Sequence, residues 1–251
     1  MTLDNFSNSF DVLLNSYARE ASFGEGSTRV SIQLDEYEKS VFLTKAQERL
    51  VISLYNGKNP LGEGFEQTEE LRRYLSNLVV EDELDPISTT NNLPLGVNSS
   101  SKFFTLPDGT TEGKPAVWFI TYEAVTIEND KCPSMTSIEV VPVRQDEYHK
   151  IKKNPFRGAN ARRALRLDLS DDVVEIVCNY TVTKYYIRYI RKVKPIILID
   201  LSSDNLEING ETDTTECELH EALHQKILED AVIMALQSRG IVSNNINNEN
   251  N

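Results

Sequence analysis

Features that define several common classes of protein are missing from this chain of 251 residues. Its three cysteines, Cys132, Cys178 and Cys217, are widely spaced and form no C-x-x-C pair. This argues against a disulfide framework or a cysteine zinc site and favours a reducing compartment. No apolar stretch approaches the ~20 residues that span a bilayer, and the first residues lack the basic and apolar regions of a secretion signal. We therefore expect a soluble protein that is made in a cytoplasm and has no membrane partner.

The sequence also arranges no nucleophile, base and orienting group in a recognisable catalytic pattern. The sharpest enzymatic motif is His220-Glu221-Ala222-Leu223-His224, a literal H-E-x-x-H. On one helix face, two such histidines can bind zinc, with the glutamate as general base. Against this hypothesis, His220 falls in the first turn of the predicted helix and no third ligand follows at the usual spacing. We therefore predict no catalytic residue, no metal and no cofactor, and keep a zinc hydrolase as an alternative.

Charge is distributed unevenly along the chain. Residues 144–194 contain 13 basic and 6 acidic residues, a local net charge of +7. Because the whole chain carries −13, the remainder carries −20. Such asymmetry is typical either of a nucleic-acid patch or of a subunit whose basic face meets the acidic face of a neighbour. We favour the second interpretation, because an acidic protein repels DNA at long range.

Hydrophobic periodicity predicts helices first, then strands, then a closing helix. Helices are expected at Asn5–Arg19, Thr68–Val80, Asp146–Lys153 and Thr215–Ser238. A second helical region is expected after Asp35, with a helix at Lys45–Asn56 that begins at a capping box of Thr44 and Gln47. Strands are expected at Ala116–Glu128, Ser137–Val143, Leu165–Leu169, Val173–Arg191 and Ile196–Leu201. Pro142 suggests that the second of these strands ends there or lies at an edge. This order predicts an α+β fold with N-terminal helices, a central mostly antiparallel β-sheet and a closing C-terminal helix.

The same patterns suggest a division of the chain. Residues 1–30 are expected to form an N-terminal helix or arm, and residues 31–240 a single α+β domain. Residues 85–101 read as a polar interaction loop or an insertion. Residues 241–251 form a polar tail that cannot bury enough apolar area to order itself.

Residues 180–192 (YTVTKYYIRYIRK) interleave aromatic and basic side chains. A platform that stacks single-stranded nucleic acid has this composition. The simpler interpretation is a strand with Ile and Tyr in the core and with Arg188 and Arg191 on an exposed or interfacial face. A nucleic-acid-binding module that uses this strand remains the alternative function.

Five stretches, in order along most of the chain, carry a resemblance to a known family: Glu36–Val51, Gly64–Val79, Glu147–Asp168, Tyr185–Leu201 and Cys217–Leu236. Through these five stretches taken together, the chain resembles the ring proteins of the neck and tail of crAss-like and related Bacteroidetes phages. In that family the closing helix often opens with proline where this chain has His220, which makes the H-E-x-x-H motif look incidental.

The resemblance implies a structural virion protein without enzyme activity, made in the bacterial host cytoplasm. It implies a ring of twelve copies below the portal, as part of the head-to-tail connector and of the channel for genomic DNA. Expected partners are other copies, the portal and neighbouring ring proteins. Arg157, Arg162 and Arg163 follow a proline turn, and the planar fork of arginine suits interfacial carboxylates. We predict these three residues, with Arg188 and Arg191, at subunit or partner contacts.

Overall fold

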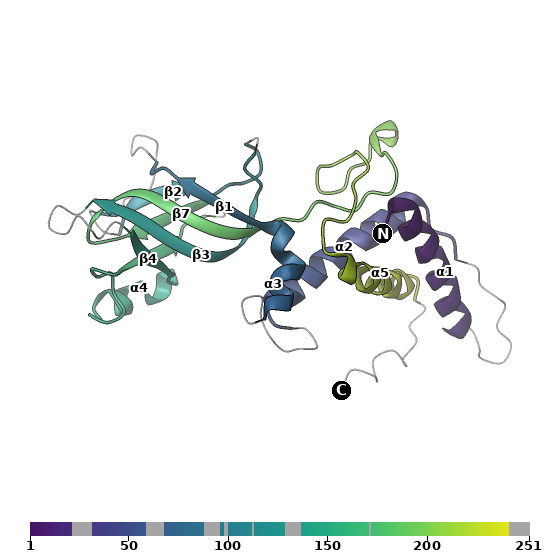
Figure 1. The fold of residues 1–251 in the computed structure, drawn as a ribbon, viewed down its shortest axis with the longest axis horizontal. Coiled ribbons are helices and arrows are strands. Elements are labelled where there is room, and N and C mark those ends of the chain that lie inside the picture. The colour runs from purple at the N-terminus through teal and green to yellow at the C-terminus, as the bar shows by residue number, and fades with distance from the viewer. Residues whose placement is uncertain are drawn as a thin grey trace. The chain divides into compact units, whose positions relative to one another are not determined.

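A computed structural model shows the chain as two compact units (Figure 1). The helical unit comprises Met1–Leu78 and Val193–Asn251, and the β unit comprises Val79–Lys192 between them. That residues 31–240 form a single domain stays a prediction. The described residues are 1–21, 32–58, 68–87, 96–97, 100–111, 113–128, 137–170 and 172–240.

Three α-helices form the core of the helical unit. Helix α1 (Leu3–Ala21) packs against α5 (His224–Ser238), which also packs against α2 (Glu36–Tyr55). The predicted N-terminal helix is confirmed, and its side chains at Phe6, Phe10, Leu14 and Ala18 are fully buried. These positions recur every four residues, so they lie on one helix face. A short helix α3 (Glu69–Leu75) continues as the 3₁₀ turn η1 (Ser76–Leu78).

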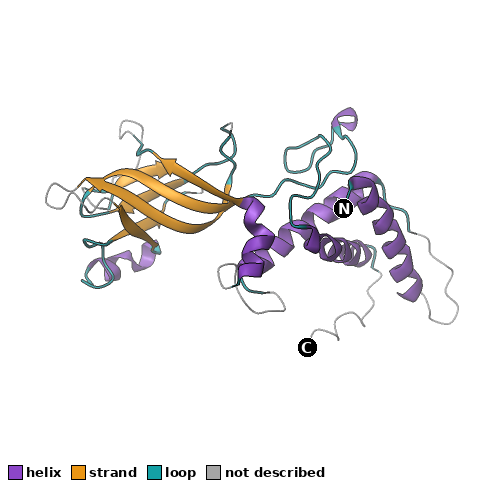
Figure 2. Ribbon diagram, viewed as in Figure 1, coloured by secondary structure: helices purple, strands orange, loops and turns teal. Residues whose placement is uncertain are grey.

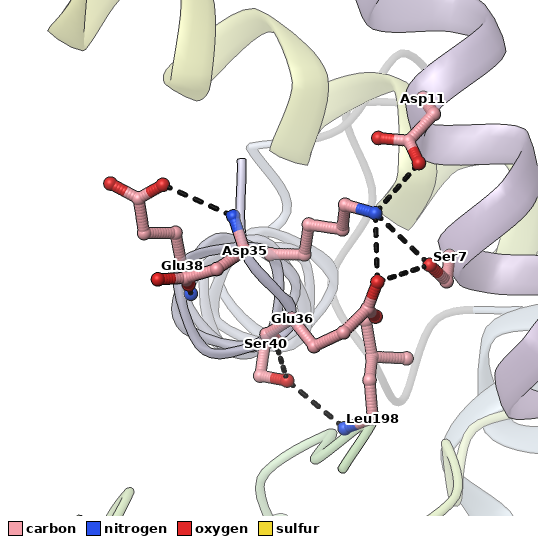
Figure 3. Close-up of polar contacts among 8 residues, drawn as sticks. Ser7, Asp11, Asp35, Glu36, Glu38, Ser40 and Leu198 are labelled. Carbon is pink, nitrogen blue, oxygen red and sulfur yellow. Dashed lines mark hydrogen bonds and ion pairs between the residues drawn. The ribbon is translucent and has the colours of Figure 1, made fainter. Parts of the chain in front are cut away.

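The predicted start of the second helix is wrong. The capping box is formed by Asp35 and Glu38, each side chain accepting the backbone N–H of the other (2.7 and 3.3 Å; Figure 3), and α2 runs unbroken from Glu36. Thr44 and Gln47 have the spacing of a capping box, but they lie buried in the middle of this longer helix. The predicted end is confirmed, because Gly57 follows with a φ of 70°.

The polar side chains of α2 explain a second error. Residues 196–201 are not a strand of the sheet. Ile196 N–H donates to Thr44 Oγ1 (3.1 Å), Leu198 N–H donates to Ser40 Oγ (3.0 Å), and Gln47 donates to the Lys194 carbonyl (2.7 Å). Helix side chains thus take the backbone hydrogen bonds that a neighbouring strand would otherwise take. Only an isolated bridge, Ile197 to Thr215, is β-like in this part of the described chain.

The closing helix is confirmed, but it begins later than predicted. Thr215 is held in the bridge to Ile197, a 3₁₀ turn η3 (Glu221–Leu223) follows, and α5 begins at His224. The apolar side chains of Ile227, Ala231 and Ala235 in α5 are buried, and Met234 is half-buried. Gly240 follows the helix with a φ of 71°, as expected for a C-terminal glycine.

The β unit contains one seven-stranded sheet in the order β1-β7-β3-β4-β5-β6-β2. All neighbours are antiparallel except β4 and β5, which are parallel and are connected through helix α4. Figure 2 shows the strands as a curled sheet with α4 beside it. The two edges approach each other where Ile87 N–H, just after β1, donates to the carbonyl of Phe103 in β2 (2.8 Å). The elements are β1 (Val79–Leu84), β2 (Lys102–Thr105), β3 (Val117–Glu128), β4 (Ser137–Pro142), α4 (Gln145–Lys152), β5 (Arg163–Asp168), β6 (Val173–Val177) and β7 (Thr181–Arg191).

Several strand predictions are confirmed and others need correction. β3, β4, β5 and α4 lie where the sequence places them, and β4 ends at Pro142. The single run Val173–Arg191 is two strands, because the chain turns at residues 178–180. The helix predicted at Thr68–Val80 ends earlier, and Val79 already belongs to β1. Most of the polar loop at residues 85–101 and the tail at 241–251 lie outside the described residues.

Candidate functional site

The H-E-x-x-H segment does not form one helix face. His220 lies before α5, as the N-cap of the 3₁₀ turn, and its exposed ring accepts the Ala222 N–H (3.2 Å). His224 is buried, and its Nε2 lies 3.0 Å from the Leu219 carbonyl and its Nδ1 2.6 Å from the Met1 amine. A neutral ring that donates from Nε2 and accepts at Nδ1 satisfies both contacts, and burial lowers the pKa of His224. Within the described part of the chain, no three His, Cys, Asp or Glu side chains are grouped as a metal site.

These positions give a direct test of the zinc alternative. We expect purified protein to carry far less than one zinc per chain by elemental analysis. His220→Ala should leave the protein folded and cost about 1 kcal/mol of unfolding free energy, because it removes the side-chain cap of the 3₁₀ turn. One zinc per chain that is lost with His220→Ala would establish the metal site instead.

The Arg/Tyr-rich strand β7 is a central element of the sheet, between β1 and β3. Tyr185, Ile187 and Tyr189 are buried. Two basic side chains of β7 reach carboxylates on β1 or just after it. Arg188 pairs with Glu81 (2.6 Å), directly opposite in the register, and Lys184 pairs with Asp85 (2.7 Å), the residue that follows β1. The hydrogen bond from Tyr186 and the contact with Arg188 lower the pKa of Glu81.

This pairing weakens the case for a nucleic-acid platform on β7. Its phosphate-binding groups are already opposed by acidic residues of the same unit, and its two largest buried rings cannot stack on bases. Arg191 ends the strand, with its guanidinium 3.5 Å from the Lys192 carbonyl. Contacts of Arg188 or Arg191 with another subunit stay a prediction.

We therefore expect mixed-sequence DNA to bind only at non-specific strength, with a Kd of ~10⁻⁴–10⁻⁶ M at physiological salt. Changing Arg188 and Arg191 to alanine together should alter this Kd less than threefold, measured by fluorescence anisotropy with a labelled single strand and a labelled duplex. Binding several orders tighter, lost in this double variant, would support the nucleic-acid alternative.

The loop that follows α4 presents the other three predicted interface arginines. In this loop (residues 154–163, the basic loop) the side chains of Arg157 and Arg162 are exposed and form no ion pair with a described residue. Arg163 begins β5, and its guanidinium donates to the Phe156 carbonyl (3.0 Å). Phe156 itself is 85% exposed. The same short loop thus carries the three arginines and an exposed aromatic ring that the sequence analysis did not single out.

The basic loop is braced by its own hydrogen bonds. Asn154 Oδ1 accepts the N–H groups of Phe156 (2.9 Å) and Arg157 (3.3 Å), and the Asn154 carbonyl accepts the Gly158 N–H (2.8 Å). Asn160 Oδ1 accepts the Arg162 N–H (2.9 Å). Side chains that close turns in this way restrict the backbone. The exposure of Phe156 is therefore a property of a defined loop conformation.

In the helical unit, a buried cation joins α1 to α2. Lys39 is 3% exposed, and its ammonium group lies 2.7 Å from Asp11, 2.9 Å from Glu36 and 3.1 Å from Ser7 (Figure 3). Burial alone would lower the pKa of Lys39, but the two carboxylates raise it above the ordinary value. The paired, charged lysine stays protonated at neutral pH, so α1 is fixed by an ion-pair network as well as by its apolar face.

Comparison with known proteins shows the family. Residues 1–247 match the family described as phage tail ring protein 3/4. Ring protein 3 of Bacteroides phage crAss001 is 45% identical over 248 residues, which cover 98% of this chain and 99% of that protein. Ring protein 4/5 of the same phage is 30% identical over 243 residues, which cover 94% and 92%. The chain belongs to the phage tail ring protein 3/4 family.

Membership of the ring protein family confirms the resemblance seen in the sequence and makes this a structural protein of the phage tail. For a ring protein, the surfaces of interest are those that can meet other copies or other ring proteins. None of the described helices is long and apolar enough to cross a membrane. The basic loop is one such surface, because it is exposed, braced and charged.

Proposed function

We propose that this chain forms a ring of twelve copies in the head-to-tail connector, below the portal, where it lines part of the conduit for genomic DNA. The observation that carries the proposal is the 45% identity to Ring protein 3 of crAss001 over nearly the full length of both chains. Because the identity to Ring protein 4/5 is lower, we assign the chain to the position of Ring protein 3. It is made in the host cytoplasm, needs no cofactor and catalyses no reaction.

The charge of the chain agrees with this role. A conduit for DNA must let phosphates pass without holding them, and a protein of net charge −13 repels them. The partners are other copies within the ring and, above and below, the portal and neighbouring ring proteins. A ring built from head-to-tail contacts needs two different complementary faces on every subunit.

Cryo-electron microscopy of virions tests the proposal directly. A twelve-fold ring below the portal whose density fits this chain would support it. The copy number is checked independently by quantifying peptides of the chain against those of the portal in purified virions. Absence of the chain from virions, or density outside the connector, would overturn the assignment.

We further propose that Arg157, Arg162 and Arg163 lie at a subunit boundary, and a charge reversal tests it. The variant Arg157→Glu/Arg162→Glu should enter virions at no more than a tenth of the normal copy number, because it replaces two exposed cations by anions. Arg163 is left in place, since its guanidinium braces the loop through the Phe156 carbonyl. The monomer should stay folded, with a change of ~0.5 kcal/mol per exposed site.

A matched control separates the position of these charges from their number. Lys45 in α2 and Arg72 in α3 are exposed and form no ion pair with a described residue. Lys45→Glu/Arg72→Glu makes the same change in net charge, and we expect normal incorporation. Equal copy numbers for the two double variants would show that the basic loop is not at a boundary.

A further inference from the structure

Two segments of the chain carry charge of a single sign. Residues 150–163, the end of α4 and the basic loop, contain six basic residues and no acidic one. Residues 200–221 contain eight acidic residues and neither lysine nor arginine. We call the second segment the acidic lobe. It belongs to the helical unit and follows β7 and precedes α5 along the chain. Figure 1 draws it in light green.

The acidic lobe is a folded surface. Its Leu201 and Ile208 are buried in one cluster with Ile197, which precedes the lobe. The Leu201 N–H donates to the Thr212 carbonyl (2.9 Å). Asn209 ties the lobe to α2 through a hydrogen bond to Glu48 (2.9 Å). The carboxylates are therefore presented on a fixed backbone.

Seven of the eight acidic side chains are exposed, and none of these seven forms an ion pair with a described residue. They are Asp200, Asp204, Glu207, Glu211, Asp213, Glu216 and Glu221. The other dense acidic run differs in this respect. In β1, Glu81 pairs with Arg188, Asp82 with Lys114, and Glu83 with Lys184. The lobe thus keeps its charge, whereas the β1 run is largely neutralised within its own unit.

The basic loop combines two properties of a protein-binding anchor. Its exposed cations are mostly free of ion pairs, and at its centre Phe156 is 85% exposed on a braced backbone. Aromatic and arginine side chains dominate the binding energy of protein interfaces. A ring held in fixed geometry also loses little entropy on binding. Because the chain as a whole carries a net charge of −13 and repels phosphates at long range, the loop fits a protein partner better than a nucleic acid.

We infer that the basic loop of one copy binds the acidic lobe of the next copy in the ring. The inference rests on the proposed ring and adds the two faces that meet. One surface is positive with an aromatic anchor, the other is negative, and both belong to the same chain, so the contact is heterologous and repeats from copy to copy. Arginine forks match carboxylates in a bidentate geometry, and the opposite charges fix the register of the two copies.

Photo-crosslinking from the loop locates its partner. A benzophenone amino acid replaces Phe156, virions are assembled from a mixture of isotopically light and heavy copies, and the crosslinked peptides are identified by mass spectrometry. We expect a peptide from residues 195–226 joined to position 156, with light–heavy pairs that show two different copies. A crosslink to another virion protein, to DNA, or to a different part of this chain would overturn the inference.

Charge exchange tests the same contact without a probe. Glu207→Lys/Glu211→Lys in the lobe and Arg157→Glu/Arg162→Glu in the loop should each lower incorporation at least tenfold. Combined in one chain, the four changes restore opposite charges across the contact, and incorporation should recover to within threefold of normal. Combining the lobe variant with the control Lys45→Glu/Arg72→Glu should restore nothing.

The outcomes separate the inference from the proposed function. The lobe variant and the loop variant could each lose incorporation without any recovery when they are combined. That result would reject the pairing of these two faces, but the proposed ring would stand. Absence of the unaltered chain from virions would reject the ring itself.

Discussion

Replacing Arg166 by methionine is expected to destabilise the β unit by about 3–5 kcal/mol at neutral pH, the usual cost of leaving a buried charge without its partner. Arg166 (12% exposed) lies 2.5 Å from the carboxylate of Glu123 (7% exposed), which also accepts the hydroxyl of Tyr185 (2.6 Å). The variant keeps an unbranched side chain in place of the arginine stem but removes the guanidinium, and it leaves the carboxylate with only the tyrosine. Urea unfolding followed by the fluorescence of Trp118, the single tryptophan, reports on this unit.

The pH dependence identifies the cause. Burial already raises the pKa of Glu123, against the lowering effect of Arg166 and Tyr185. Without the arginine this pKa rises further above its unfolded value. The destabilisation by Arg166→Met is then complete above the pKa of Glu123 in the folded variant. It shrinks as the pH falls from there toward the lower pKa of Glu123 in the folded unaltered protein, because the folded variant takes up the proton more readily. We expect a smaller loss of stability at pH 5 than at pH 8.

The partner substitution gives a contrasting result. Glu123→Gln should cost less, about 1.5–3 kcal/mol, because Arg166 keeps an ion pair of 2.8 Å with Asp168. It should show no relief at low pH, since arginine stays protonated. Arg144→Met, which breaks an exposed pair with Asp146, serves as the control, with an expected change below ~1 kcal/mol. Equal losses from all three substitutions would contradict a buried ion pair.

Phe10→Ala is expected to cost the helical unit about 3–5 kcal/mol, the usual range for a phenylalanine removed from a core. Phe10 has no exposed surface and lies on the face of α1 that packs against α5. Helical circular dichroism during urea unfolding measures the loss. Limited proteolysis should cut α1 of the variant faster, because this helix loses part of its buried face.

Val12, on the exposed side of the same helix, supplies the control. Its side chain is 69% exposed, so Val12→Ala should change stability by at most ~0.5 kcal/mol. If both substitutions have the same small effect, the packing of α1 against α5 does not stabilise the helical unit.

Local periodicity was sufficient to predict the elements with regular alternation or a clear stop signal. α1, β3, β4, α4 and β5 all fall within a few residues of their predicted bounds. The errors occur where neighbours in space decide the outcome. Ile196–Leu201 has the apolar composition of a strand, yet polar residues of α2 bond its backbone, and short apolar runs do not identify their partner. At Val79 no glycine or proline separates the helix from β1, so the change of structure left no local signal.

The candidate interface was partly visible in the sequence. The proline turn correctly drew attention to Arg157 and its neighbours as loop residues. The exposure of Phe156 was not predictable, because phenylalanine is usually buried. The hydrogen bonds of Asn154 and Arg163 to the Phe156 backbone, which brace the loop, depend on the folded structure. The acidic lobe did leave a signal, a run of 22 residues with eight acidic and no lysine or arginine side chains, which a count over short windows would have detected.

The division of the helical unit between both ends of the chain has a consequence for the order of events during synthesis. α5 is made after the β unit, and α1 cannot complete its buried face until α5 has left the ribosome. The β unit can fold before that, and its first and last strands are paired, with Val79 opposite Ile190. Their pairing brings the two flanks of the inserted segment together, which shortens the loop that the helical unit must close and lowers its entropy cost. A prematurely terminated chain that lacks α5 would therefore contain a complete β unit and an incomplete helical unit.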